Sequence, residues 1–123
     1  MPDTQHSARS TQHSLHGKTI LVGVSGGIAC YKAVHVVRKL TRIGAEVHVA
    51  MTKAAQQFVG PLTFEALSHH NVLTDVMALD ERSQIVHVEL GRQVDLIVVA
   101  PATCDMIARL AHGLADDPVS VTV

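Results

Sequence analysis

Polar residues that can bind or activate a ligand gather directly after three apolar runs of the chain. The polar segments are Ser25-Gly26-Gly27, Thr52-Lys53-Ala54 and Pro101-Ala102-Thr103-Cys104-Asp105, and they follow the runs at residues 19–24, 46–51 and 95–100. If the runs form parallel strands, the segments lie beyond the carboxyl ends of the strands, where open α/β sheets bind their ligands. The sequence therefore predicts one shared ligand edge.

Ser25-Gly26-Gly27 has the chemistry of a phosphate-binding loop. It offers a hydroxyl group and unhindered backbone N–H groups at the start of an expected helix, where the helix dipole favours an anion. The glycines fit neither the dinucleotide fingerprint G-x-G-x-x-G nor the Walker loop, since no Gly-Lys-Ser/Thr follows them. A tight strand-to-helix turn that needs glycine for packing alone explains the same residues, so both interpretations stay open.

The other side chains of this edge also have structural explanations. Thr52 and Thr103 can each cap a helix, and Asp105 in a first helical turn suits the helix dipole. Their shared position after strands favours a common ligand edge. Cys30 and Cys104 stand near the starts of two expected helices, and we interpret both as small packing residues.

His87 is the one histidine, among nine, that we single out for acid–base chemistry. It lies between Val86 and Val88, ahead of the run at residues 95–100, and an imidazole exchanges protons near neutral pH. A histidine between valines is also commonly structural, so this alternative stays open. No histidine has a partner at metal-ligand spacing, and the sequence therefore predicts no metal site.

The elements that must position these residues alternate between strands and helices. Thr19–Val24 and Asp95–Ala100 are near-continuous apolar runs typical of buried strands, and Glu46–Met51 is a further strand. Helices are predicted from the stripe Ala33, Val36, Val37 and Leu40 with a stop at Gly44, from Thr52 to Val59, over Leu62–Ser68, and from Thr103 to Gly113. The alternation predicts an α/β fold with a doubly wound parallel sheet.

Two segments fit either a strand or a helix. Gln84–Leu90 alternates like a strand but stands directly before a better strand. Val119–Val123 has strand propensity, although Asp117-Pro118 is good chemistry for the start of a helix. Both choices stay open at the level of the sequence.

The composition excludes several classes of protein. A formal net charge of −1 and 2% aromatic residues argue against a nucleic-acid binder, and two cysteines indicate a reducing compartment rather than a disulfide framework. There is no export signal, and the apolar run Leu96–Ala102 is far shorter than the ~20 residues that span a bilayer. We expect a cytoplasmic protein without membrane contact, with a disordered polar tail at residues 1–17 and one domain at residues 18–123.

Read in order, the motifs VSGGIA, MTKAA, H-V-E-L and APAT with GLADD resemble the flavin-containing cysteine decarboxylase family, most closely its branch in coenzyme A synthesis. The likeness covers about residues 18–118. It implies a flavodoxin-like or Rossmann-like fold, bound FMN, and homotrimers or dodecamers with the site at subunit contacts. It also implies that the small-molecule substrate is 4′-phosphopantothenoylcysteine, which is decarboxylated to 4′-phosphopantetheine after oxidation of its cysteine moiety at sulfur.

The same resemblance assigns site residues. The family's active-site histidine corresponds to His87, which is thereby the expected catalytic residue. Its flavin-contacting positions correspond to Ser25, Gly26, Gly27, Ile28, Thr52, Lys53, Ala54, Thr103, Cys104, Asp105 and Met106. The family also places a helix after GLADD, which favours the helix interpretation at Pro118.

The sequence departs from the family pattern in two places. The family's Ser-Ala-Asn-Thr flavin motif reads Thr103-Cys104-Asp105-Met106 here, and the chain stops at Val123, before a Pro-x-Met-Asn motif, a flap with a catalytic cysteine and the ligase domain of bifunctional members. We therefore expect an enzyme domain that is incomplete at its C-terminus. Two alternatives stay open: a flavin prenyltransferase or peptide cysteine decarboxylase on the same scaffold, and a non-catalytic flavoprotein-like subunit.

Overall fold

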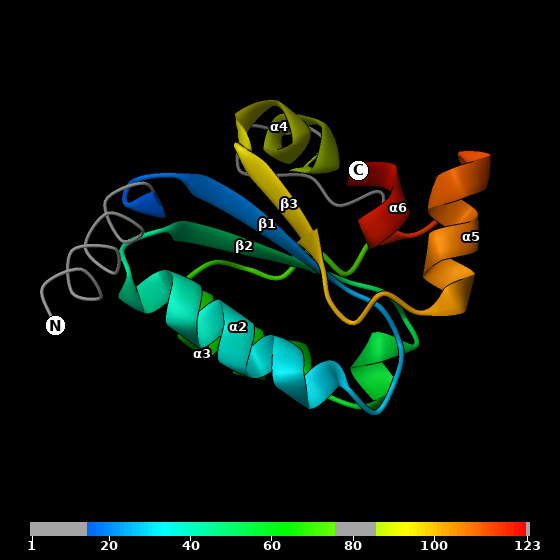
Figure 1. Cartoon of the computed structure of the whole chain (residues 1–123), viewed down its shortest axis with the longest axis horizontal. Helices are drawn as coiled ribbons and strands as arrows, with labels where there is room; N and C mark the ends of the chain where they lie inside the picture. The colour runs from blue at the N-terminus through cyan, green and yellow to red at the C-terminus, as the bar shows by residue number, and fades with distance from the viewer. Residues whose placement is uncertain (1–14, 76–85, 123) are drawn as a thin grey trace, which may run out of the picture.

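The computed structural model describes residues 15–75 and 86–122 and shows a three-stranded parallel sheet with helices on both faces (Figure 1). In chain order the elements are β1 (Thr19–Val24), α2 (Cys30–Arg42), β2 (Glu46–Met51), the 3-10 turn η1 (Ala55–Gln57), α3 (Pro61–Ser68), α4 (Val86–Gln93), β3 (Leu96–Val99), α5 (Cys104–His112) and α6 (Pro118–Thr122). The doubly wound α/β fold expected from the sequence is confirmed.

β1 is the central strand of the sheet. The strand order is β2-β1-β3, and both neighbours run parallel to β1. Its side chains alternate between two cores, as a strand buried on both faces requires. Ile20 and Val22 pack with α2 and α3 in the larger core, while Leu21 lies in a smaller core with residues of α4, α5 and α6. In Figure 1, α2 and α3 lie below the sheet and α4 above it.

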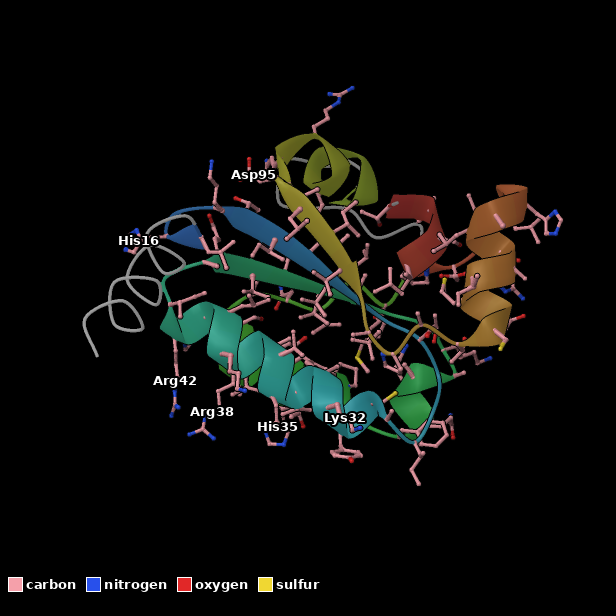
Figure 2. All side chains as sticks on the ribbon, in the orientation of Figure 1. His16, Lys32, His35, Arg38, Arg42 and Asp95 are labelled. Atoms are coloured by element: carbon pink, nitrogen blue, oxygen red, sulfur yellow. The ribbon has the colours of Figure 1, made fainter. Side chains whose placement is uncertain are left out.

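Helix α2 presents three of the four residues of the predicted apolar stripe to the larger core, with Leu40 partly buried, whereas Val36 is not part of that core. Ala33 and Val37 are buried there, whereas the side chains of Lys32, His35, Arg38 and Arg42 point away from the sheet (Figure 2). The helix ends before Gly44, whose φ of 90° is a left-handed conformation that glycine adopts without strain. The predicted stop is therefore confirmed.

Residues 15–17 of the predicted polar tail contact the domain. Leu15 packs against the larger core, and the Gly17 N–H donates to the Gly44 carbonyl at 3.0 Å. The rest of the predicted tail, residues 1–14, lies outside the described residues. None of the helices within the described ranges is both long and apolar enough to cross a membrane.

The helix predicted from Thr52 to Val59 is wrong. The Thr52 hydroxyl accepts a hydrogen bond from the Ala55 N–H at 3.0 Å, and only the short 3-10 turn η1 follows. Gly60 then takes an extended conformation, with φ −71° and ψ 147°, so the chain leaves the turn and α3 starts at Pro61. A threonine cap signal thus marks a local turn here rather than a full helix.

Both open choices between strand and helix are decided in favour of helix. α4 begins at Val86, so the described part of Gln84–Leu90 is helical. α6 begins at Pro118, because Asp117 caps it: one carboxylate oxygen accepts from the N–H groups of Val119 and Ser120, each at 2.9 Å.

β3 is shorter and less buried than the run Asp95–Ala100 predicts. Within the described residues it pairs only with β1, and Leu96 is 47% exposed. The expectation of a fully buried strand is wrong for this part of the chain, because complete burial of a parallel strand needs neighbours on both of its edges as well as helices over its faces.

We expect the 123-residue chain to self-associate through β3 when it is expressed alone. An unpaired strand edge offers backbone N–H and C=O groups to another copy, and lysine at an edge suppresses such pairing. Leu96→Lys should therefore reduce the aggregation measured by light scattering, whereas Ile107→Lys, at a similarly exposed apolar residue of α5, should not. A monodisperse, cooperatively unfolding unmodified chain would contradict this expectation.

Candidate functional site

The polar segments predicted to share one edge of the sheet do meet there. A cavity of about 270 Å³ opens beyond the carboxyl ends of the strands, and it is lined by Ser25, Gly26, Thr52, Lys53, Ala54, Thr103, Asp105, Met106, Arg109, Asp116 and Asp117. Because the strand order is β2-β1-β3, this edge runs from Lys53 through Gly26 to Thr103. The fold thus brings together eight of the residues that the sequence assigned to a ligand.

Ser25 joins the loops that follow β1 and β3. Its side chain is buried, and its hydroxyl group donates to the Pro101 carbonyl oxygen. The Ser25 Oγ atom also accepts from the Thr103 N–H at 3.3 Å. The hydroxyl is therefore occupied in holding the site together. Ser25 also lines the cavity, and its role as a ligand-binding residue stays a prediction.

Gly26 brings the loop after β1 against the loop after β2. A Cβ atom added at Gly26 would lie 2.5 Å from the Ala54 Cβ and 3.1 Å from the Ala54 carbonyl carbon. Only glycine permits this approach. The packing explanation of the Ser25-Gly26-Gly27 turn is therefore correct at Gly26.

The phosphate explanation of the same turn remains compatible with the geometry. Helix α2 starts only at Cys30, and the N–H groups of Gly26, Gly27 and Ile28 donate no hydrogen bond within the described part of the chain. Such groups are free to donate to an anion. The turn thus serves close packing at Gly26, which lines the cavity, and leaves backbone donors available at and directly after this residue.

Thr52 and Thr103 both act as caps. Thr52 closes the turn that leads into η1, and the Thr103 hydroxyl accepts from the Met106 N–H at 3.1 Å at the start of α5. Met106 reaches the cavity but is 1% exposed and belongs to the smaller core. Packing therefore accounts for most of its surface.

Three of the predicted residues that the structure describes, Gly27, Ile28 and Cys104, do not line the cavity. A Cβ atom added at Gly27 would lie 3.7 Å from the Thr103 Cγ2, an ordinary van der Waals distance, and Ile28 is 83% exposed. Cys104 is exposed in the first turn of α5, so its interpretation as a packing residue is wrong, whereas Cys30 is buried and donates to the Ser25 carbonyl at 3.1 Å. The backbone of His87 lies in the first turn of α4, and its side chain is outside the described part of the structure.

Arg109, Asp116 and Asp117 line the cavity but were missed from the sequence. Arg109 donates to Asp105 at 2.8 Å and to Asp116 at 2.7 Å, and these hydrogen bonds raise the pKa of the guanidinium above its usual value. The pair of Asp105 and Arg109 has the i, i+4 spacing of a helical ion pair, a signal that could have been found. No pattern in the neighbouring sequence indicates that Asp116 also binds Arg109.

Charge is distributed unevenly along the cavity. The ammonium group of Lys53 and the free glycine N–H groups lie at the end near β2 and β1. The carboxylates of Asp105, Asp116 and Asp117 lie at the end near β3 and α5, where Arg109 neutralises part of their charge. The arrangement suits an elongated ligand with an anionic group at one end and hydrogen-bond donors at the other.

The fold and this cavity define a Rossmann-like α/β domain with a ligand site at the carboxyl edge of its sheet. The family model described as Flavoprotein matches residues 8–123, so the chain belongs to the flavoprotein family. It is 52% identical over 111 residues to the coenzyme A biosynthesis bifunctional protein CoaBC of Mycobacterium tuberculosis H37Rv, covering 90% of this chain and 26% of that protein. The chain thus spans about a quarter of the length of this relative.

Two solved structures show the same fold. The FMN-dependent cysteine decarboxylase SpaF aligns with a TM-score of 0.79 and 34% identity, covering 88% of this chain and 62% of SpaF. A PPC decarboxylase mutant complexed with pantothenoylaminoethenethiol aligns with a TM-score of 0.73 and 24% identity, covering 87% of this chain and 59% of that one. At that identity the second likeness supports the fold alone.

Proposed function

We propose that the chain is the FMN-binding decarboxylase part of a longer protein and converts 4′-phosphopantothenoylcysteine to 4′-phosphopantetheine in coenzyme A biosynthesis. The observation that carries the proposal is the cavity at the carboxyl edge, built from the same segments that resemble the decarboxylase family. Identity of 52% to a coenzyme A biosynthesis protein supports this substrate over those of more distant relatives.

The residues at the cavity fit a flavin nucleotide. The free N–H groups of Gly26 and Gly27, together with Lys53, would hold the phosphate, because backbone donors and an ammonium group both suit an anion. Arg109 and Asp105 would offer a donor and acceptors to the polar ring atoms. When bound, FMN supplies the oxidation at the substrate's sulfur that makes loss of CO₂ feasible. His87 would exchange a proton with the substrate during the decarboxylation.

The exposed apolar side chains near the cavity support assembly into oligomers. Four such side chains are more than half exposed: Ile28 in the loop after β1, Tyr31 in α2, Phe58 in the segment between η1 and α3, and Leu62 in α3. A patch of large exposed apolar side chains is typical of a contact surface. We include in the proposal a cytoplasmic homotrimer or dodecamer in which this surface meets a neighbouring subunit.

The full-length protein should purify with bound FMN and release CO₂ from 4′-phosphopantothenoylcysteine. The flavin is identified by its absorption spectrum and by chromatography after denaturation, and turnover is followed by mass spectrometry. A peptide ending in cysteine and a dimethylallyl phosphate serve as competing substrates. Preference for either competitor would assign the chain to another branch, and flavin without turnover of any substrate would favour a non-catalytic subunit.

A further inference from the structure

A second cluster of polar side chains lies at the other end of the sheet from the cavity. Glu46 is the first residue of β2, and His48, two positions later, projects from the same face of the strand. His70 follows α3 and reaches the same place, although it is 22 to 24 positions away in the chain. Because the cavity lies beyond the carboxyl ends of the strands, this cluster has no part in the proposed flavin site.

The route of the chain after α3 explains how His70 reaches β2. α3 ends at His69, which takes a left-handed conformation with φ 65°, and the His70 N–H donates to the Ser68 hydroxyl at 3.3 Å. The chain then runs along the outer edge of β2, where the Leu73 N–H donates to the Val49 carbonyl at 2.9 Å. The position of His70 is therefore set by backbone hydrogen bonds on both sides of it.

The three side chains place one oxygen and two nitrogen atoms close together. Glu46 Oε1 lies 3.5 Å from His70 Nε2 and 4.0 Å from His48 Nε2, and ligand atoms of all three residues lie within 4.8 Å of one another. Two ligand atoms of a tetrahedral zinc site are separated by roughly 3.3 Å, as metal–ligand bonds of about 2.0–2.1 Å require. Small side-chain rotations would bring the three atoms to that spacing.

The side chains also have suitable freedom and charge for coordination. They are 20%, 36% and 55% exposed for His48, His70 and Glu46, so they can rotate and a water molecule can complete the coordination. The imidazole rings of His48 and His70 are stacked with centroids 4.2 Å apart. The Glu46 carboxylate and the two imidazoles are among the side-chain groups that bind zinc.

We propose that Glu46, His48 and His70 bind one divalent transition-metal ion, with zinc as the ion best suited to two imidazoles and one carboxylate. A bound ion would tie the segment after α3 to the amino end of β2. Its effect is therefore on stability of this edge of the sheet, and not on the chemistry at the cavity.

The test compares zinc binding by the untagged full-length protein and by two variants at neighbouring histidines. His70→Asn removes a proposed ligand, while His69→Asn changes an exposed histidine outside the cluster to a residue that tolerates its left-handed conformation. Titration calorimetry should show that His70→Asn loses one zinc equivalent or binds it at least ~10-fold more weakly, whereas His69→Asn matches the unmodified protein. Zinc binding by histidines elsewhere in the chain is the same in all three proteins, so it does not affect the comparison.

Two further measurements complete the test. Zinc should raise the melting temperature of the unmodified protein and of His69→Asn, but not that of His70→Asn. If His70→Asn does not fold, Glu46→Gln removes a half-exposed ligand from the strand and should show the same loss of zinc. Equal zinc stoichiometry and affinity in the unmodified protein and the folded ligand variant would overturn the proposal.

Discussion

Replacing His87 by asparagine should lower the rate of decarboxylation by about 10²–10⁴-fold while FMN stays bound, because loss of a general acid or base typically has an effect of this size. Asparagine keeps a polar side chain of similar length but cannot exchange a proton near neutral pH. His87 lies in the first turn of α4, which packs against α6, and the cap of α6, Asp117, lines the cavity. The rate is measured under saturating substrate with the full-length protein.

The control for this prediction is a histidine far from the cavity. His35 is exposed on α2 and points away from the sheet (Figure 2), so His35→Asn should leave both turnover and flavin content unchanged. An unchanged rate in His87→Asn would show that this residue has no catalytic role. Parallel loss of flavin and turnover would instead indicate that His87 is structural.

Gly26→Ala should weaken FMN binding by roughly 10- to 100-fold. The new methyl group would lie 2.5 Å from the Ala54 Cβ and 3.1 Å from a backbone carbon, so the loops after β1 and β2 would have to move apart. Overpacking of this kind costs about 1–3 kcal/mol, and each 1.4 kcal/mol is a tenfold change in affinity. The displacement would also shift the free N–H groups that are proposed to hold the phosphate.

Gly60→Ala is the matched control for Gly26→Ala. An added Cβ at Gly60 meets no atom within 4 Å, and its φ of −71° suits alanine. Affinities are obtained by titrating the apoproteins with FMN and following the quenching of flavin fluorescence. Equal affinities in Gly26→Ala and the unmodified protein would show that the contact between the two loops does not shape the flavin site.

Much of the fold follows from short stretches of sequence. The bounds of β1 and β2 agree with the predicted runs, and the stops at Gly44 and Gly113 and the cap at Thr103 are also as expected. These features depend on hydrogen bonds and side-chain alternation among residues a few positions apart. The edge where the polar segments meet was also predictable, because parallel strands have their carboxyl ends at the same edge of the sheet.

Other features depend on contacts between distant parts of the chain. The cavity includes Arg109 because Asp105 and Asp116 both reach it, and the metal cluster forms because the segment after α3 runs back along β2. Sequence spacing predicted no metal site, since His70 is far from Glu46 and His48 in the chain. The partial exposure of β3 likewise reflects which strands lie beside it.

By itself, the sequence determined the α/β class, two of the strands, the ends of α2 and α5, and the edge of the sheet where the polar segments meet. The tertiary structure decided how far β3 is buried, that Ser25 joins two loops, and that Gly26 touches Ala54. The physical reason is the separation along the chain of the residues that interact. Local hydrogen bonds and periodicity are written in neighbouring residues, whereas close approaches such as that of Gly23 and Val119 arise only when the whole chain buries its apolar surface.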